Sequence, residues 1–263
     1  MKQLTKNTKD IIKNRMDARL KNLYSAIAIC LSYDYDHYFI AGNSCNAAAP
    51  HDFDIYPWGK DFDFKSIRSR IKSVGGYVVI ETRNALTVNI NGQVVQFCNY
   101  NKPDLISLIE SFDFAHIQVG IAVDIVWRPG DSEDDIGGYD CSIIRYAEYT
   151  DDWIQSHMLE TTWYTGSEYP LSSLIRLNKY LQRGCYASKH EYKKDVLNIL
   201  NDIISRGYKN YEDYKDQLAA VDLLLLEPEE KEAAWDLFRT CGDSGLVEQF
   251  NHNWEEDNYE DDR

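Results

Sequence analysis

Apolar side chains recur at helical spacing near the start of the chain and at alternate positions soon after it. Residues 8–31 carry isoleucine, leucine and methionine three or four positions apart, with basic residues between them, which predicts an amphipathic helix. The dipeptide Asn91-Gly92 separates two alternating runs and predicts a tight hairpin. Strands are predicted at 38–40, 52–56, 77–81, 85–90, 93–98 and 112–126.

Two short helices are predicted among these strands, and the pattern after residue 150 is helical. Ser188 and Glu191 have the spacing of a capping box. Helices are predicted at 64–74, 103–110, 151–159, 170–182, 188–206, 211–225 and 228–239. We therefore expect an α+β fold with a cleft between two lobes. The expected parts are a lobe at 1–130 with a small mixed sheet and helices on one side, a helical C-terminal lobe at 131–250, and an acidic flexible tail at 251–263.

Composition narrows the class of protein. The chain has 263 residues and 44% hydrophobic residues, which predicts packed cores rather than disorder. It has no run of eighteen apolar residues and no apolar segment at its start, so we expect neither a membrane span nor a secretory signal. Six cysteines without C-x-x-C spacing are typical of reduced thiols, so we expect a cytoplasmic protein. The net charge of −15 opposes wholesale nucleic-acid binding but allows a local basic groove.

The most informative chemistry is a pair of acids behind a small turn. Asp52 and Asp54 alternate with apolar residues, so a strand would project both carboxylates from one face. Two carboxylates this close repel each other unless a cation lies between them, and Mg²⁺ suits such an oxygen-rich pair. Upstream, Gly42 and Ser44 would let a backbone turn approach phosphate groups and offer donors to them. The alternative is a solvated acid pair in an acidic chain.

A third carboxylate is needed for a two-metal phosphoryl-transfer site. Asp113, in Phe112-Asp113-Phe114, repeats the apolar-Asp-apolar form around Asp54 and is predicted to begin a strand. The alternative role for Asp113 is to cap the turn between a helix and that strand. Gln96 occupies the other place where a third acid would be expected, but its side chain is neutral.

These residues resemble the nucleotidyltransferase superfamily, which has the polymerase-beta-like catalytic fold. Gly42-Asn43-Ser44 matches the family's small turn, Asp52-Phe53-Asp54 its paired acids, and Asp113 its third acid; His51 departs from the apolar residue expected there. The likeness covers roughly residues 8–126. A narrower resemblance, carried by residues 111–114 and 172–184, is to uncharacterised phage and large-virus proteins with this core.

A basic helix follows the predicted catalytic sheet. Arg176, Lys179, Tyr180 and Arg183 are spaced so that they share one helical face, while leucines take another. Such a face could clamp a triphosphate, as arginine and lysine do in phosphoryl transfer. The alternative is an ordinary solvated surface.

The resemblance implies a reaction and its components. Asp52, Asp54 and Asp113 would hold Mg²⁺ or Mn²⁺, and Gly42, Asn43 and Ser44 would bind the phosphates of a nucleoside triphosphate together with the basic helix. The nucleoside monophosphate would pass to an RNA end, a protein side chain or a small-molecule hydroxyl, with release of pyrophosphate. The alternative function is an inactive relative whose acidic surface binds a protein partner or mimics nucleic acid.

Overall fold

The computed structural model describes residues 2–20, 23–46, 52–82, 84–127 and 141–206. The chain divides into two units, one made of 1–168 and 177–198 and the other of 169–176 and 199–263. The lobe boundaries expected near residues 130 and 250 fall outside the described residues, so they stay predictions.

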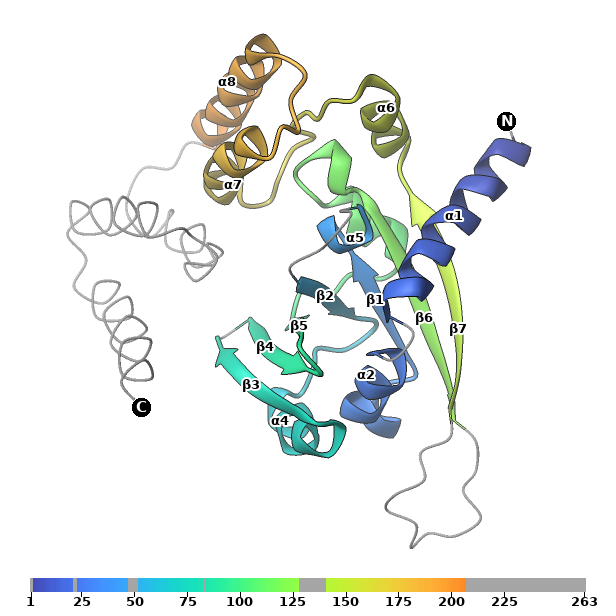
Figure 1. Cartoon of the computed structure of the whole chain (residues 1–263). Coiled ribbons are helices and arrows are strands. Elements are labelled where there is room, and N and C mark those ends of the chain that lie inside the picture. The colour runs from blue at the N-terminus through green and yellow to red at the C-terminus, as the bar shows by residue number, and fades with distance from the viewer. Residues whose placement is uncertain (1, 21–22, 47–51, 83, 128–140, 207–263) are drawn as a thin grey trace, which may run out of the picture. The chain divides into compact units, whose positions relative to one another are not determined.

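Within the described part of the first unit, one mixed sheet contains seven strands (Figure 1). The strands are β1 His37–Ala41, β2 Asp52–Pro57, β3 Gly76–Glu81, β4 Ala85–Ile90, β5 Gln93–Cys98, β6 Val119–Trp127 and β7 Cys141–Tyr149. Their order in the sheet is β3-β4-β5-β2-β1-β6-β7. The β2–β5 pair is parallel and each of the other neighbouring pairs is antiparallel. The predicted α+β class is therefore confirmed.

The last two strands differ from the sequence prediction. The strand expected at 112–126 begins at Val119, because a turn and a short 3-10 helix, η3 Ala115–Ile117, come first. Asp113 therefore lies in a turn and does not begin a strand. The edge strand β7 was not predicted, since the adjacent apolar pair Ile143-Ile144 breaks clean alternation.

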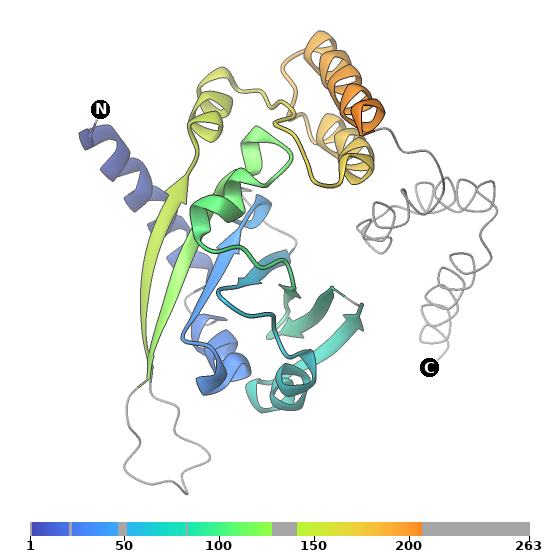
Figure 2. The same cartoon turned by 180° about the vertical axis from the view of Figure 1, so that it is seen from behind.

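Helices cover the two faces of the sheet unequally. The expected single helix at 8–31 is two helices, α1 Lys2–Leu20 and α2 Leu23–Leu31. Together with α4 Phe64–Ile71 they bury one face of the sheet in the larger hydrophobic core. On the opposite face, α5 Leu105–Glu110 packs Leu105 and Leu108 on Phe39 of β1. Figure 2 shows the sheet from behind, with the green helical segment of α5 over the blue strand β1. The expectation of helices on one side thus holds for three helices and is wrong for α5.

Local sequence signals explain where these elements begin and turn. Asn91 and Gly92 both have positive φ, 53° and 81°, as a type I′ hairpin turn requires. The Asp104 carboxylate caps α5 by accepting a hydrogen bond of 2.7 Å from the Ser107 N–H, so the helix begins after Pro103 and not at it.

Three described helices follow the sheet as predicted: α6 Asp151–Leu159, α7 Pro170–Gln182 and α8 Lys189–Ser205. The capping box is formed, because the Glu191 N–H donates to Ser188 Oγ and the Ser188 N–H donates to Glu191 Oε2. The helices expected at 211–225 and 228–239 lie outside the described residues. Within the described ranges, every helix is too short or too polar to cross a bilayer.

Candidate functional site

The acid pair lies where the alternation of β2 predicts it. Phe53 and Ile55 are 2% and 0% exposed and belong to the larger core, whereas Asp52 and Asp54 are half-buried and project from the opposite face. The two carboxylates are therefore neighbours on the face of the sheet that α1, α2 and α4 leave uncovered. Oxygen ligands at this spacing suit a small divalent cation, whose charge would offset their mutual repulsion.

The strand β5, which pairs with β2, places the side-chain amide of Gln96 beside the acid pair. In the parallel pairing of β2 with β5, Asp54 stands opposite Gln96. The Gln96 Nε2 donates to Thr87 Oγ1 at 3.0 Å, and Cys98 Sγ donates to Gln96 Oε1 at 3.5 Å. The neutral side chain at position 96 is thus held in place beside Asp54, where an acid would complete a carboxylate triad.

The glycine turn closes the end of β1. Gly42 has a φ of +84°, and its N–H donates to Val119 O at 2.9 Å. A Cβ at this position would lie 3.7 Å from the ring of Phe112. Glycine is required here because the left-handed backbone disfavours a side chain. The four-residue helix α3 Asn43–Asn46 follows at once.

The residues predicted to bind phosphate differ in how deeply their side chains are buried. Ser44 is 1% exposed, and its hydroxyl donates to Ala41 O at 3.2 Å. Its hydroxyl can therefore reach a phosphate only by giving up that bond. Asn43 is half-buried. The assignment of Gly42, Asn43 and Ser44 to phosphate binding stays a prediction.

Two residues near this turn were missed by sequence reasoning. The Cys45 thiol is fully buried and its pKa is raised to about 12, chiefly by burial; the Asp54 charge raises it further, whereas the Ser44 hydrogen bond and Arg19 lower it. Arg19, at the end of α1, donates from Nη1 to Ser44 O at 3.4 Å. Cys45 therefore lies within electrostatic range of both Asp54 and Arg19. A basic residue in the last turn of a helix is too common to have indicated this.

Asp113 follows Phe112, whose ring lies near the Gly42 turn. A Cβ added to Gly42 would contact the Phe112 ring, so this ring lies close to the turn, and its centroid is 5.8 Å from that of Tyr56 on β2. Asp113 itself is 2% exposed, and its carbonyl accepts a hydrogen bond of 3.0 Å from the Thr165 N–H. Among the described residues, no three histidine, cysteine, aspartate or glutamate side chains gather closely enough to hold a metal ion. A role for Asp113 on a metal shared with Asp52 and Asp54 therefore stays a prediction.

The basic face of α7 is narrower than predicted. Arg176 and Arg183 are exposed and Lys179 is half-buried, but Tyr180 is only 6% exposed. The Tyr180 ring packs edge-on at 4.9 Å from Phe114 and at 4.4 Å from His116. Tyr180 therefore belongs to the buried face with Leu177, because a large ring at the edge of a helical face can turn inward. Leu181, predicted as apolar face, is 36% exposed.

The three basic residues are divided between the two units. Arg176 belongs to the second unit, whereas Lys179 and Arg183 belong to the first. Their shared contact with a triphosphate stays a prediction.

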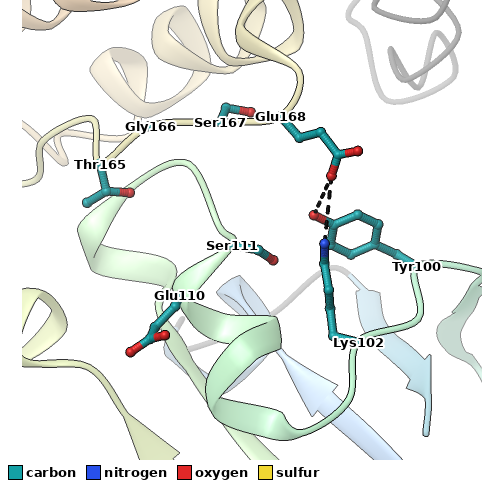
Figure 3. A pocket seen from close by; sticks show the side chains of 8 residues that line it. All are labelled: Tyr100, Lys102, Glu110, Ser111, Thr165, Gly166, Ser167 and Glu168. Atoms are coloured by element: carbon teal, nitrogen blue, oxygen red, sulfur yellow. Dashed lines mark hydrogen bonds and ion pairs between the residues drawn. The ribbon is translucent and has the colours of Figure 1, made fainter. Parts of the chain in front are cut away.

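A pocket of about 230 Å³ opens close to α5 (Figure 3). It is lined by Tyr100, Lys102, Glu110, Ser111, Thr165, Gly166, Ser167 and Glu168. Lys102 Nζ lies 3.7 Å from a Glu168 carboxylate oxygen, to which the Tyr100 hydroxyl donates at 3.4 Å. None of the predicted site residues lines this pocket, which is smaller than a typical small-molecule site.

Among known proteins, only solved structures are similar to this chain. No protein-family model matches it, and no curated protein matches it. Structures with a similar fold include a Thermotoga maritima CCA-adding enzyme in complex with tRNA, at 12% identity and a TM-score of 0.46, with 88% of this chain and 53% of that chain covered. A CCA-adding enzyme in complex with CTP gives 12% identity and a TM-score of 0.48, covering 88% of this chain and 54% of that one. A tRNA-processing enzyme gives 12% identity and a TM-score of 0.42, covering 86% of this chain and 62% of that one.

This chain thus spans a little over half the length of the structures it resembles. At this identity and these TM-scores, the likeness carries no conclusion about activity. The narrower resemblance to phage and large-virus proteins stays a prediction.

Proposed function

We propose that this protein is a metal-dependent nucleotidyltransferase, which moves a nucleoside monophosphate from a nucleoside triphosphate to an acceptor and releases pyrophosphate. The observation that carries the proposal is the placement of Asp52 and Asp54 side by side on the face of β2 that points away from the larger core. The Gly42 turn lies at the end of the adjacent strand β1. A left-handed glycine turn beside an acid pair is an arrangement suited to holding phosphates and their counter-cation.

Each group has a role in this scheme. Asp52 and Asp54 would hold Mg²⁺ or Mn²⁺, which when bound supplies charge neutralisation to the phosphates. The left-handed turn at Gly42 would let the backbone approach the β- and γ-phosphates, with the Asn43 amide and a rotated Ser44 hydroxyl as donors to them. Arg176, Lys179 and Arg183 would neutralise the remaining phosphate charge. Asp113 would hold the acceptor hydroxyl and take its proton as the oxygen attacks the α-phosphorus.

The acceptor belongs to one of three classes: an RNA end, a protein side chain or a small-molecule hydroxyl. Local basic groups, and not the whole surface, would have to bind RNA, because the chain carries a net charge of −15. Incubation of the protein with each radiolabelled nucleoside triphosphate and a cell lysate would show which molecule acquires label.

Metal-dependent nucleotide binding tests the proposal before the acceptor is known. Wild-type protein should bind a fluorescent nucleoside triphosphate with Mg²⁺ and release it with a chelator, and the Asp52→Asn, Asp54→Asn double variant should not bind it. Asp124→Asn is the matched control, since Asp124 is a half-buried acid on β6, bonded to His37. Wild-type protein that binds no nucleotide in the presence of metal would refute the proposal and favour a non-catalytic protein-binding role.

A further inference from the structure

Gln118 is a buried glutamine whose side chain joins three segments of the first unit. It lies between η3 and β6 and is 3% exposed. Its Nε2 donates to Phe112 O and to Thr165 Oγ1, both at 3.0 Å, and its Oε1 accepts from Thr150 Oγ1 at 2.8 Å. The Thr150 N–H also donates to Gln118 O at 3.1 Å. The side-chain amide thus uses both its nitrogen and its oxygen inside the protein.

The same network also holds the two carbonyl groups on either side of the Asp113 Cα, which are those of Phe112 and of Asp113 itself. Thr165 Oγ1 donates to Phe112 O at 2.8 Å, so this oxygen accepts from Thr165 and from Gln118. The Thr165 N–H donates to Asp113 O at 3.0 Å. Because a fully satisfied buried network is rigid, it leaves the peptide units around Asp113 little freedom to rotate.

The Phe112–Asp113 turn, which this network holds, adjoins the residues proposed to take part in the reaction. The Phe112 ring lies close enough to Gly42 that a Cβ added there would touch it. The ring also lies 5.8 Å from that of Tyr56, which stands two residues after Asp54 on the same face of β2. A shift of the Phe112–Asp113 peptide would therefore move the turn that adjoins the predicted phosphate site. An apolar side chain at position 118 would leave Phe112 O with one donor and Thr150 Oγ1 without its acceptor.

We propose that Gln118 is a positioning residue, which fixes the Phe112–Asp113 turn against the Gly42 turn so that Asp113 acts on the acceptor. This inference rests on the proposed function. Gln118 acts through Asp113 and touches neither nucleotide nor acceptor. A displacement of about 1 Å in a positioned group is enough to slow a chemical step roughly a hundredfold.

A double-mutant cycle tests this coupling. Gln118→Met, Asp113→Asn and the double variant are compared for nucleotide affinity with Mg²⁺ and for label transfer at saturating nucleotide. Gln118→Met should slow transfer by about 10- to 100-fold and leave nucleotide affinity within about twofold. The double variant should be no slower than Asp113→Asn alone. Gln155→Met, at an exposed glutamine of α6, is the matched control and should behave as wild type.

Variants of Thr165 test the same proposal if Gln118→Met does not fold. Thr165→Val removes the hydroxyl that donates to Phe112 O and should reproduce the loss of transfer, and Thr165→Ser, which keeps the hydroxyl, should restore it. Multiplied losses in the double variant, a loss confined to nucleotide affinity, or unchanged transfer would each overturn the proposal.

Hydrogen exchange separates this inference from the proposed function. Gln118→Met should speed exchange of the Thr165 N–H by about tenfold or more while amides of β1 keep their protection. Unchanged exchange at Thr165 would overturn the positioning role even in an active enzyme. Faster exchange in a protein that binds no nucleotide would show that the proposed function had failed and that the network only stabilises the fold.

Discussion

Asp54 stands directly opposite Gln96 in the parallel pairing of β2 with β5. An acid at position 96 would place a third carboxylate beside the pair formed by Asp52 and Asp54. The chain instead has a neutral amide there, hydrogen-bonded to Thr87. Two carboxylates alone give a cation few protein ligands, so we expect metal to bind weakly until the phosphates of the nucleotide add their oxygens.

Gln96→Glu should therefore raise the affinity for Mn²⁺ in the absence of nucleotide. We expect a gain of about tenfold or more, which is roughly 1.4 kcal/mol, because the carboxylate adds a negative charge and an oxygen ligand beside the pair. Mn²⁺ titration followed by electron paramagnetic resonance measures the change. Gln93→Glu, which adds the same charge at the exposed start of β5, is the control. Equal Mn²⁺ affinity in Gln96→Glu and wild type would mean that the metal does not bind at this place.

Asp54→Ala should abolish nucleotide transfer without weakening the fold. Removal of one of two neighbouring acids relieves their repulsion, so the free energy of unfolding should stay within about 1 kcal/mol of wild type or rise. Denaturant unfolding and label transfer, measured on the same preparation, give the two quantities. Transfer at the wild-type rate would show that Asp54 is not part of the site. A large loss of stability would make the activity result uninformative, and Asp54→Asn would then be measured instead.

The basic face of α7 should contribute to nucleotide binding through charge. Arg176→Ala combined with Lys179→Ala should weaken binding of a nucleoside triphosphate by about tenfold at low ionic strength, and by less at high salt, because counterions screen exposed charges. Fluorescence titration at several salt concentrations gives the slope. Lys193→Ala, at an exposed lysine of α8, is the control. Identical affinities in the double variant and wild type would show that the basic face of α7 is an ordinary solvated surface that does not bind nucleotide.

Sequence pattern predicted the elements of this fold better than their contacts. Alternation at Asp52–Ile55 placed both carboxylates correctly on one face of β2, opposite Phe53 and Ile55, because a strand has a fixed period of two. The turn at Asp113 was mistaken for a strand, since the alternating Phe-Asp-Phe segment is too short to separate the two structures. The network around Gln118 joins residues up to 53 positions apart, and no local pattern predicts such pairing. Arg19 was missed for the same reason, because its contact with Ser44 depends on how α1 packs.

His116 should make the stability of the protein fall in weak acid. Burial first, and then the charges of His157 and Arg183, lower its pKa from 6.5 to about 3, while its Nδ1 is 2.7 Å from Thr162 Oγ1. The unfolded chain takes up a proton near pH 6.5, whereas the folded chain does not until about pH 3, so this stabilisation is complete above pH 6.5 and is lost as pH falls toward 3. Between pH 7.5 and pH 5, the free energy of unfolding should drop by roughly 2 kcal/mol on account of His116.

His116→Gln isolates this contribution, because glutamine stays neutral and can still bond with Thr162. Denaturant unfolding at pH 7.5 and pH 5 should show a smaller loss in the variant than in wild type, by roughly 2 kcal/mol, even though other groups titrate in both proteins. Nuclear magnetic resonance of the imidazole provides the direct measurement, since the ring should remain neutral in the folded protein at pH 5. An equal loss of stability in the two proteins, or a protonated ring at pH 5, would show that the His116 site opens to water.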